Sequence, residues 1–110
     1  MLFNETWGME NEDESFQGYH PESRKWVRSL YYLAKELDPT RLVEDNSPDK
    51  NDHVVTDLNS WHGYMPALIY ASHLDDIIAK TYPGSDWNYI GDNRQTDIPL
   101  LNSECGAEHG

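Results

Sequence analysis

The sequence has little cysteine and few basic residues, and both shortages limit what the chain can do. Its 110 residues include one cysteine, Cys105, which has no partner for a disulfide within the chain. Eight Lys and Arg stand against 20 Asp and Glu, which gives a formal net charge of −12. Because a polyanion repels phosphate groups and anionic lipids, we expect no binding to nucleic acid and none to membrane surfaces.

Long apolar runs are also missing. No stretch approaches the roughly 18 apolar residues of a membrane span, and no basic segment followed by an apolar run opens the chain. These features leave the cellular location open. Large side chains are plentiful, however, with 12% aromatic residues that include four Trp and seven Tyr. This content favours a folded domain over a disordered acidic segment.

Sequence patterns for cofactors and metals are absent as well. The chain contains no Gly-x-Gly-x-x-Gly fingerprint and no P-loop, which argues against an open nucleotide-binding sheet. The polar residues at 49–57 do not follow the calcium-loop pattern, and the five His residues lack zinc-site spacing. We therefore expect that the chemistry of this chain needs no cofactor and no metal ion.

Strand-like segments do recur along the chain. They are short, apolar or β-branched, and they are separated by polar loops or by helical patterns. Four such segments lie near residues 1–4, 41–45, 54–59 and 98–103. Alternation of strands and helices is typical of parallel strands that are covered by helices. We expect these four strands to run parallel and to lie adjacent in chain order.

Two segments show helical periodicity. Residues 23–38 place apolar side chains at spacings of four, three and four, which predicts a helix with one buried stripe. The stripe consists of Trp26, Leu30, Leu33 and Leu37. Asp38-Pro39 ends this helix, because proline disfavours helical geometry in the residue before it. A second helix is predicted to begin at Pro66 and to end before Tyr82-Pro83-Gly84.

A glutamate follows a short apolar run near each end of the chain. Glu5 lies in Leu-Phe-Asn-Glu-Thr-Trp-Gly, and Glu104 lies in Leu-Leu-Asn-Ser-Glu-Cys-Gly. A barrel of parallel strands presents functional residues at the carboxyl ends of its strands. Two carboxylates displayed there fit glycoside cleavage, in which one donates a proton and the other attacks or activates water.

A complete barrel needs about 250 residues, more than twice this length. The fold class that we predict is therefore α/β, with residues 1–110 forming a fragment of a (β/α)8 TIM barrel.

Three motifs in register resemble the catalytic barrel of glycoside hydrolase family 2, which includes β-galactosidases, β-glucuronidases and β-mannosidases. They are Asn4-Glu5, Leu37-Asp38-Pro39-Thr40-Arg41 and Ser103-Glu104-Cys105-Gly106-Ala107. The resemblance implies that the chain covers approximately strands four to seven of the barrel. It also implies that Glu5 is the general acid/base, that Asn4 contacts the sugar and that Glu104 is the nucleophile.

The resemblance implies further sugar contacts from the segment that follows the 54–59 strand. The candidates are Trp61, His62 and Tyr64, and Trp7 joins them because it lies close to Glu5 in the sequence. Aromatic rings stack on the C–H faces of sugars, and phenol or imidazole groups can bond to sugar hydroxyls. Packing in the core is the alternative for this aromatic group.

Together these residues predict a retaining, exo-acting β-glycosidase that hydrolyses O-glycosidic bonds of oligosaccharides or glycoconjugates. Retention requires the Glu5 and Glu104 carboxyl groups to lie about 5 to 6 Å apart. The alternative is a catalytically incompetent fragment that binds carbohydrate or has only a structural role. The expected partners are a carbohydrate substrate, the remainder of the barrel and, by the resemblance, β-sandwich domains. The residues do not identify the sugar or the linkage.

Overall fold

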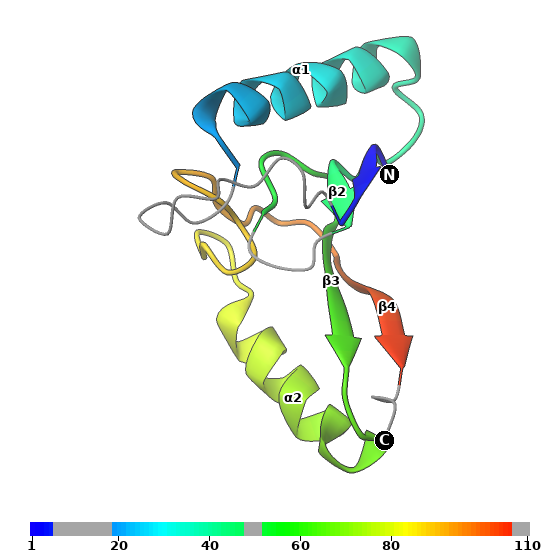
Figure 1. Cartoon of the computed structure of the whole chain (residues 1–110), viewed down its shortest axis with the longest axis vertical. Coiled ribbons are helices and arrows are strands. Elements are labelled where there is room, and N and C mark those ends of the chain that lie inside the picture. The colour runs from blue at the N-terminus through cyan, green and yellow to red at the C-terminus, as the bar shows by residue number, and fades with distance from the viewer. Residues whose placement is uncertain (6–18, 48–51, 107–110) are drawn as a thin grey trace.

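The computed structural model describes residues 1–5, 19–47 and 52–106. In chain order its elements are β1 (Phe3–Asn4), α1 (Pro21–Leu37), β2 (Asn46–Ser47), β3 (Asn59–Tyr64), α2 (Ala67–Lys80) and β4 (Leu100–Gly106). Helix α1 lies at the β1–β2 end of the molecule, and α2 runs beside the longer β3–β4 pair (Figure 1). Both predicted helices are thus present. Neither described helix combines the length and the apolar character that crossing a bilayer requires.

Every strand pairing in the described residues is parallel. β1 pairs with β2, with Phe3 opposite Asn46, and β3 pairs with β4, with Asn59 opposite Leu100. The two pairs form separate two-stranded sheets, and β2 lies next to β3 without joining it in one sheet. The parallel direction is the one expected from the strand and helix alternation. The continuous sheet is not seen, so the partial TIM barrel stays a prediction.

The third strand begins later than its β-branched residues suggest, and the prediction of a strand over residues 54–59 is wrong. The backbone N–H groups of Val54 and Val55 donate to Asp45 Oδ2 at 2.7 and 3.0 Å. A side-chain carboxylate thus takes the donors that a strand would offer to its neighbour. The strand is instead β3, so the predicted sugar contacts Trp61, His62 and Tyr64 lie within it and not in a loop after it.

The second and fourth strands are also displaced toward the C-terminus. Leu2 and Phe3 donate their N–H groups to the carbonyls of Glu44 and Asp45, so this part of the chain does lie beside β1. The regular strand, however, is β2 at Asn46–Ser47 and not residues 41–45. β4 extends to Gly106, which places Glu104 inside a strand.

Helix α1 turns a different face to the core than its apolar spacing predicts. Val27 is fully buried and Tyr31 is 8% exposed, whereas Trp26, Leu33 and Leu37 are 51, 48 and 77% exposed. The prediction of a buried stripe through Trp26 is therefore wrong. Adjacent helical residues point about 100° apart, so burial of Val27 rotates Trp26 toward solvent. The small buried apolar cluster contains Tyr19, Val27, Val54 and Ile90.

Asp57 ties α1 to the segment before β2. Its carboxylate accepts hydrogen bonds from the Tyr31 hydroxyl at 2.6 Å, the Lys35 ammonium at 2.9 Å and the Val43 N–H at 2.8 Å. Burial alone would raise the pKa of Asp57. The donors outweigh burial and hold the pKa of this carboxyl below its ordinary value.

We expect Asp57→Asn to lower the free energy of unfolding at pH 7 by about 1 to 3 kcal/mol, because charge-assisted bonds are lost. A carboxyl with a depressed folded pKa stabilises the fold above its unfolded pKa, near 4. That stability is lost as the pH falls through the folded pKa. Urea denaturation should therefore show the variant and the wild type converging below about pH 4. Asp76→Asn, in an exposed position on α2, is the matched control. Equal losses for both variants at every pH would contradict this account.

Candidate active site

Glu5, His62 and Glu104 converge from three distant segments of the chain. Glu5 directly follows β1, His62 lies in β3 and Glu104 lies in β4. His62 Nδ1 is 3.1 Å from Glu5 Oε1, and His62 Nε2 is 3.6 Å from Glu104 Oε1. One potential ligand atom from each residue lies within 4.8 Å of the other two. Two glutamates from opposite ends of the chain thus meet around one imidazole.

A β-bulge in β4 brings Glu104 to this point. Trp61 lies opposite Asn102 and His62 lies opposite Glu104, so Ser103 is the extra residue. Side chains alternate between the two faces of a strand, so a regular β4 would turn Glu104 to the same face as Asn102. The bulge re-aims the carboxylate toward His62, as bulges near functional sites often do.

Hydroxyl groups hold the imidazole and one carboxylate in place. Ser47 Oγ lies 2.7 Å from His62 Nε2 and 2.8 Å from Ser103 Oγ, and the Tyr64 hydroxyl donates to Glu104 Oε2. The imidazole side chain is only 1% exposed, whereas the side chains of Glu5 and Glu104 are 28 and 38% exposed. The carboxylates therefore reach solvent, and both lie against the buried imidazole of His62.

The backbone at Glu5 is held in an uncommon conformation. Its φ is 46°, in the left-handed region that residues other than glycine rarely occupy. The Glu5 N–H donates to the Ser47 carbonyl at 3.1 Å, which continues the β1–β2 pairing through this residue. Such conformations persist only where the surroundings fix them, and they cluster at functional sites.

The structure brings some of the predicted sugar contacts to the site and separates others from it. Tyr64 touches Glu104 and is 45% exposed. Trp61 is 4% exposed and packs against the rings of Tyr70 and His73 on α2. Trp61 is thus packed in the interior as the core alternative describes, and its sugar contact stays a prediction.

The remaining candidates are neighbours of Glu5 in the sequence. Asn4 is exposed next to Glu5 in the sequence, and Trp7 lies outside the described residues. Ser47 and Ser103 were missed as members of the site. Ser103 could have been found from its place in the Ser-Glu-Cys-Gly-Ala motif, but Ser47 sits in a polar stretch that carries no comparable signal.

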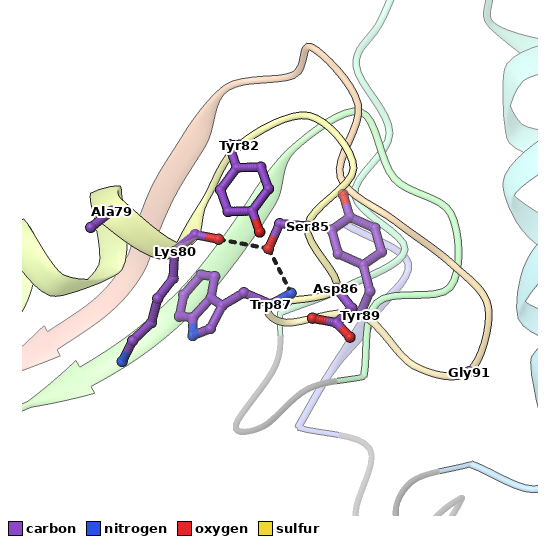
Figure 2. Close-up of a pocket in the computed structure, with 8 residues that line it drawn as sticks. All are labelled: Ala79, Lys80, Tyr82, Ser85, Asp86, Trp87, Tyr89 and Gly91. Atoms are coloured by element: carbon purple, nitrogen blue, oxygen red, sulfur yellow. Dashed lines mark hydrogen bonds between the residues drawn. The ribbon is translucent and has the colours of Figure 1, made fainter.

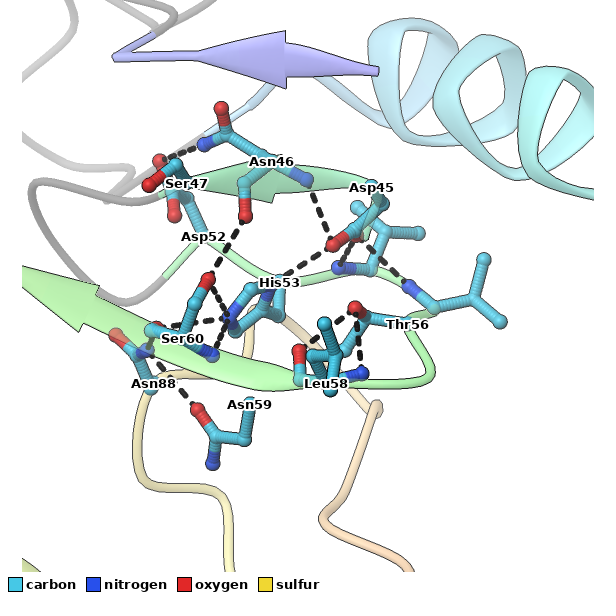
Figure 3. A network of polar contacts seen from close by, with 12 residues as sticks. Asp45, Asn46, Ser47, Asp52, His53, Thr56, Leu58, Asn59, Ser60 and Asn88 are labelled. Carbon is cyan, nitrogen blue, oxygen red and sulfur yellow. Dashed lines mark hydrogen bonds and ion pairs between the residues drawn. The ribbon is translucent and has the colours of Figure 1, made fainter. Parts of the chain in front are cut away.

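Behind the site, the fully buried carboxylate of Asp45 holds two loops together (Figure 3). It accepts hydrogen bonds from the N–H groups of Asn46, Val54 and Val55 at 2.8, 2.7 and 3.0 Å. Its fourth donor is His53 Nδ1 at 2.7 Å. Four donors compensate for removing this charge from water. Asp45 thereby fixes β2, whose Ser47 contacts His62.

His53 carries the connection from Asp45 to the start of β3. The ring is fully buried, and its Nε2 lies 3.0 Å from both the backbone N and the backbone O of Ser60. The N–H can donate to a neutral ring, and the carbonyl can accept from a protonated one. Burial alone would lower the pKa of His53. The hydrogen bond to Asp45 and the charge of Asp45 outweigh burial and raise this pKa.

A shallow pocket of about 450 Å³ lies apart from these residues, where α2 ends (Figure 2). Ser85 is one of its lining residues, and it accepts a hydrogen bond from the Trp87 N–H and donates one to the Lys80 carbonyl. The lining residues are Ala79, Lys80, Tyr82, Ser85, Asp86, Trp87, Tyr89 and Gly91. None of the predicted catalytic or sugar-contact residues is among them.

The Asp45–His53 pair predicts a pH-dependent stability. A histidine whose folded pKa is raised stabilises the fold fully below its unfolded pKa, near 6.5, and loses this contribution as the pH rises through the folded value. Urea denaturation of the wild type should therefore show a loss of stability above about pH 6.5 that His53→Asn lacks. His20→Asn, in an exposed position before α1, is the control and should retain the wild-type slope. The same slope in His53→Asn would exclude His53 as its source.

Two carboxylates reach solvent side by side, one buried imidazole lies between them, and one tyrosine hydroxyl is bonded to Glu104. No protein-family model, no characterised protein and no solved structure was found to match this chain.

Proposed function

We propose that this chain carries both catalytic carboxylates of a retaining, exo-acting β-glycosidase, with Glu5 as acid/base and Glu104 as nucleophile. The observation that supports this most is their convergence, with one oxygen of each within 4.8 Å of the other. Retaining enzymes hold their two carboxyl groups about 5 to 5.5 Å apart. Inverting enzymes need about 6.5 to 9.5 Å, because a water molecule must fit between sugar and base. The short separation therefore favours retention.

In the first step Glu104 attacks the anomeric carbon of a bound sugar. The bond from that carbon to the aglycone oxygen breaks, and Glu5 donates its proton to the departing oxygen. The product is a glycosyl ester of Glu104. In the second step water attacks the same carbon while Glu5 accepts the water proton. The ester bond breaks, Glu104 returns as a carboxylate, and the sugar leaves with its original anomeric configuration.

The surroundings of the two glutamates suit these roles. Tyr64 donates to Glu104, which fixes the direction of its oxygens for attack. The exposed face of Tyr64 beside this carboxylate offers a surface on which a sugar ring can stack. Asn4 is exposed next to Glu5 and can bond to a sugar hydroxyl through its amide. The assignment of acid and nucleophile to particular glutamates comes from the motif resemblance.

The alternative function, a carbohydrate-binding or structural fragment without turnover, is favoured by a different observation. The two strand pairs do not form one sheet, and large apolar side chains stand in solvent, among them Leu37 at 77% and Leu68 at 97% exposed. Unpaired strand edges and exposed apolar side chains are typical of surfaces that further chain normally covers. Our proposal therefore includes the rest of a barrel as the partner that makes the site competent.

We predict that the 110 residues alone hydrolyse nitrophenyl β-glycosides at least about a hundredfold more slowly than the same residues within a complete barrel, because looseness of about 1 Å costs that much. The measurement compares initial rates of nitrophenol release with and without a complementing fragment that supplies the missing strands. Full activity of the isolated, monomeric chain would contradict the need for a partner.

In the complete barrel, Glu104→Gln should reduce turnover by about a thousandfold or more, and Glu22→Gln, at an exposed glutamate of α1, should leave turnover unchanged.

Glu5→Gln should reduce the rate by about 10² to 10⁴ for substrates with poor leaving groups. The loss should be much smaller with dinitrophenolate, which leaves without a proton. Proton NMR of the first product should show a retained β-anomer. A sugar that raises the melting temperature but is never turned over would favour the alternative function instead.

A further inference from the structure

We propose that Glu5, His62 and Glu104 also form a binding site for a divalent transition-metal cation of the zinc type. The donor set consists of one imidazole nitrogen and two carboxylate oxygens, which suits Zn²⁺. Mg²⁺ and Ca²⁺ prefer sites built from oxygen alone. Spacing along the sequence cannot reveal such a site, because its ligands come from three distant segments of the chain.

Binding one cation through His62 Nδ1 requires Glu104 to turn from the Nε2 side of the ring toward Nδ1. Ligands on Zn²⁺ lie about 2.0 to 2.2 Å from the metal, so two of them are about 3.4 Å apart in a tetrahedral site. Glu5 Oε1 and His62 Nδ1 are already 3.1 Å apart. Glu104 Oε1 lies 3.6 Å from the other ring nitrogen, Nε2, and one ligand atom from each of the three residues lies within 4.8 Å of the other two. The glutamate side chains are 28 and 38% exposed, so they can rotate inward, and the cation can reach them from solvent.

A hydrogen bond at the second ring nitrogen, Nε2, would orient the buried imidazole of His62 for metal binding. When Nδ1 binds the cation, Nε2 carries the proton and donates it to Ser47 Oγ, 2.7 Å away. Ser47 can turn its own hydroxyl hydrogen toward Ser103 Oγ at 2.8 Å. Metal-bound histidines commonly donate their other N–H in this way, which fixes the tautomer and the ring direction. The Tyr64 hydroxyl orients Glu104 in the same manner.

Charge also favours a cation here. Two carboxylates face one imidazole, and the whole chain has a formal charge of −12, which raises the local concentration of cations. A bound Zn²⁺ would neutralise both carboxylates. This consequence alone depends on the proposed function: Glu104 could not attack a sugar and Glu5 could not carry a proton while both ligate the metal. Zinc would then be a reversible inhibitor.

The experiment is calorimetric titration of the 110-residue chain with ZnCl₂ at pH 7, in a chelator-free buffer that contains excess Mg²⁺ to occupy non-specific carboxylates. We expect one site, with affinity reduced by at least about tenfold in both His62→Gln and Glu104→Gln. The matched controls His20→Gln and Glu22→Gln remove the same groups from exposed positions and should bind zinc like the wild type. Ser47→Ala should weaken binding by about 10- to 100-fold as a positioning residue.

A measurement on the wild type alone guards against variants that fail to fold. Long-range ¹H–¹⁵N spectra of the imidazoles should show zinc shifting the Nδ1 resonance of His62 and leaving the buried His53 unchanged. Unchanged His62 resonances, equal zinc affinity in wild type and Glu104→Gln, or loss of binding in excess Mg²⁺ would each overturn the proposal. Because no readout uses a glycoside, failure here is distinct from failure of the glycosidase proposal.

Discussion

The buried carboxylate of Asp45 is the interaction on which the rest of the structure depends. It accepts four hydrogen bonds, three from backbone N–H groups and one from His53, so it replaces strand pairing where the chain passes from β2 to β3. A buried carboxylate with all of its donors in place favours one arrangement of the surrounding backbone. Loss of any donor would leave a buried carboxylate oxygen without a hydrogen bond, which costs free energy. Polar hydrogen bonds thus dominate the centre, and among the described residues the buried apolar cluster contains four side chains, Tyr19, Val27, Val54 and Ile90.

This arrangement fixes the positions of the site residues. Asp45 holds β2, which pairs with β1 and so places Glu5, and His53 holds the backbone of Ser60 two residues before His62. The bulge at Ser103 then turns Glu104 toward the same imidazole. One buried network and one extra residue in β4 thus bring the site residues together, while both carboxylates remain open to solvent. Catalytic and metal sites both need side chains that are held in place by their neighbours.

Much of this could be predicted from sequence, and the failures have physical causes. Helical periodicity found both helices, and the motifs around Glu5 and Glu104 indicated two residues that the structure brings together. The buried face of α1 was missed because Trp26 and Val27 are both apolar, and packing selected Val27. The strand at 54–59 was misplaced because β-branched residues there donate to Asp45, which no local pattern reveals. Ser47 and the bulge at Ser103 depend on contacts between distant segments.

In the proposed reaction, Glu104 is the nucleophile that forms a glycosyl ester, and Glu5 transfers the proton. The most direct measurement is covalent trapping in the complete barrel with a panel of 2-deoxy-2-fluoro β-glycosides, which slow the second step, followed by peptide mass spectrometry. The account predicts one fluoroglycosyl group on Glu104, with none in Glu104→Gln. Label on another carboxylate in a protein that hydrolyses the parent glycoside, or turnover with inversion and no trapped ester, would contradict it.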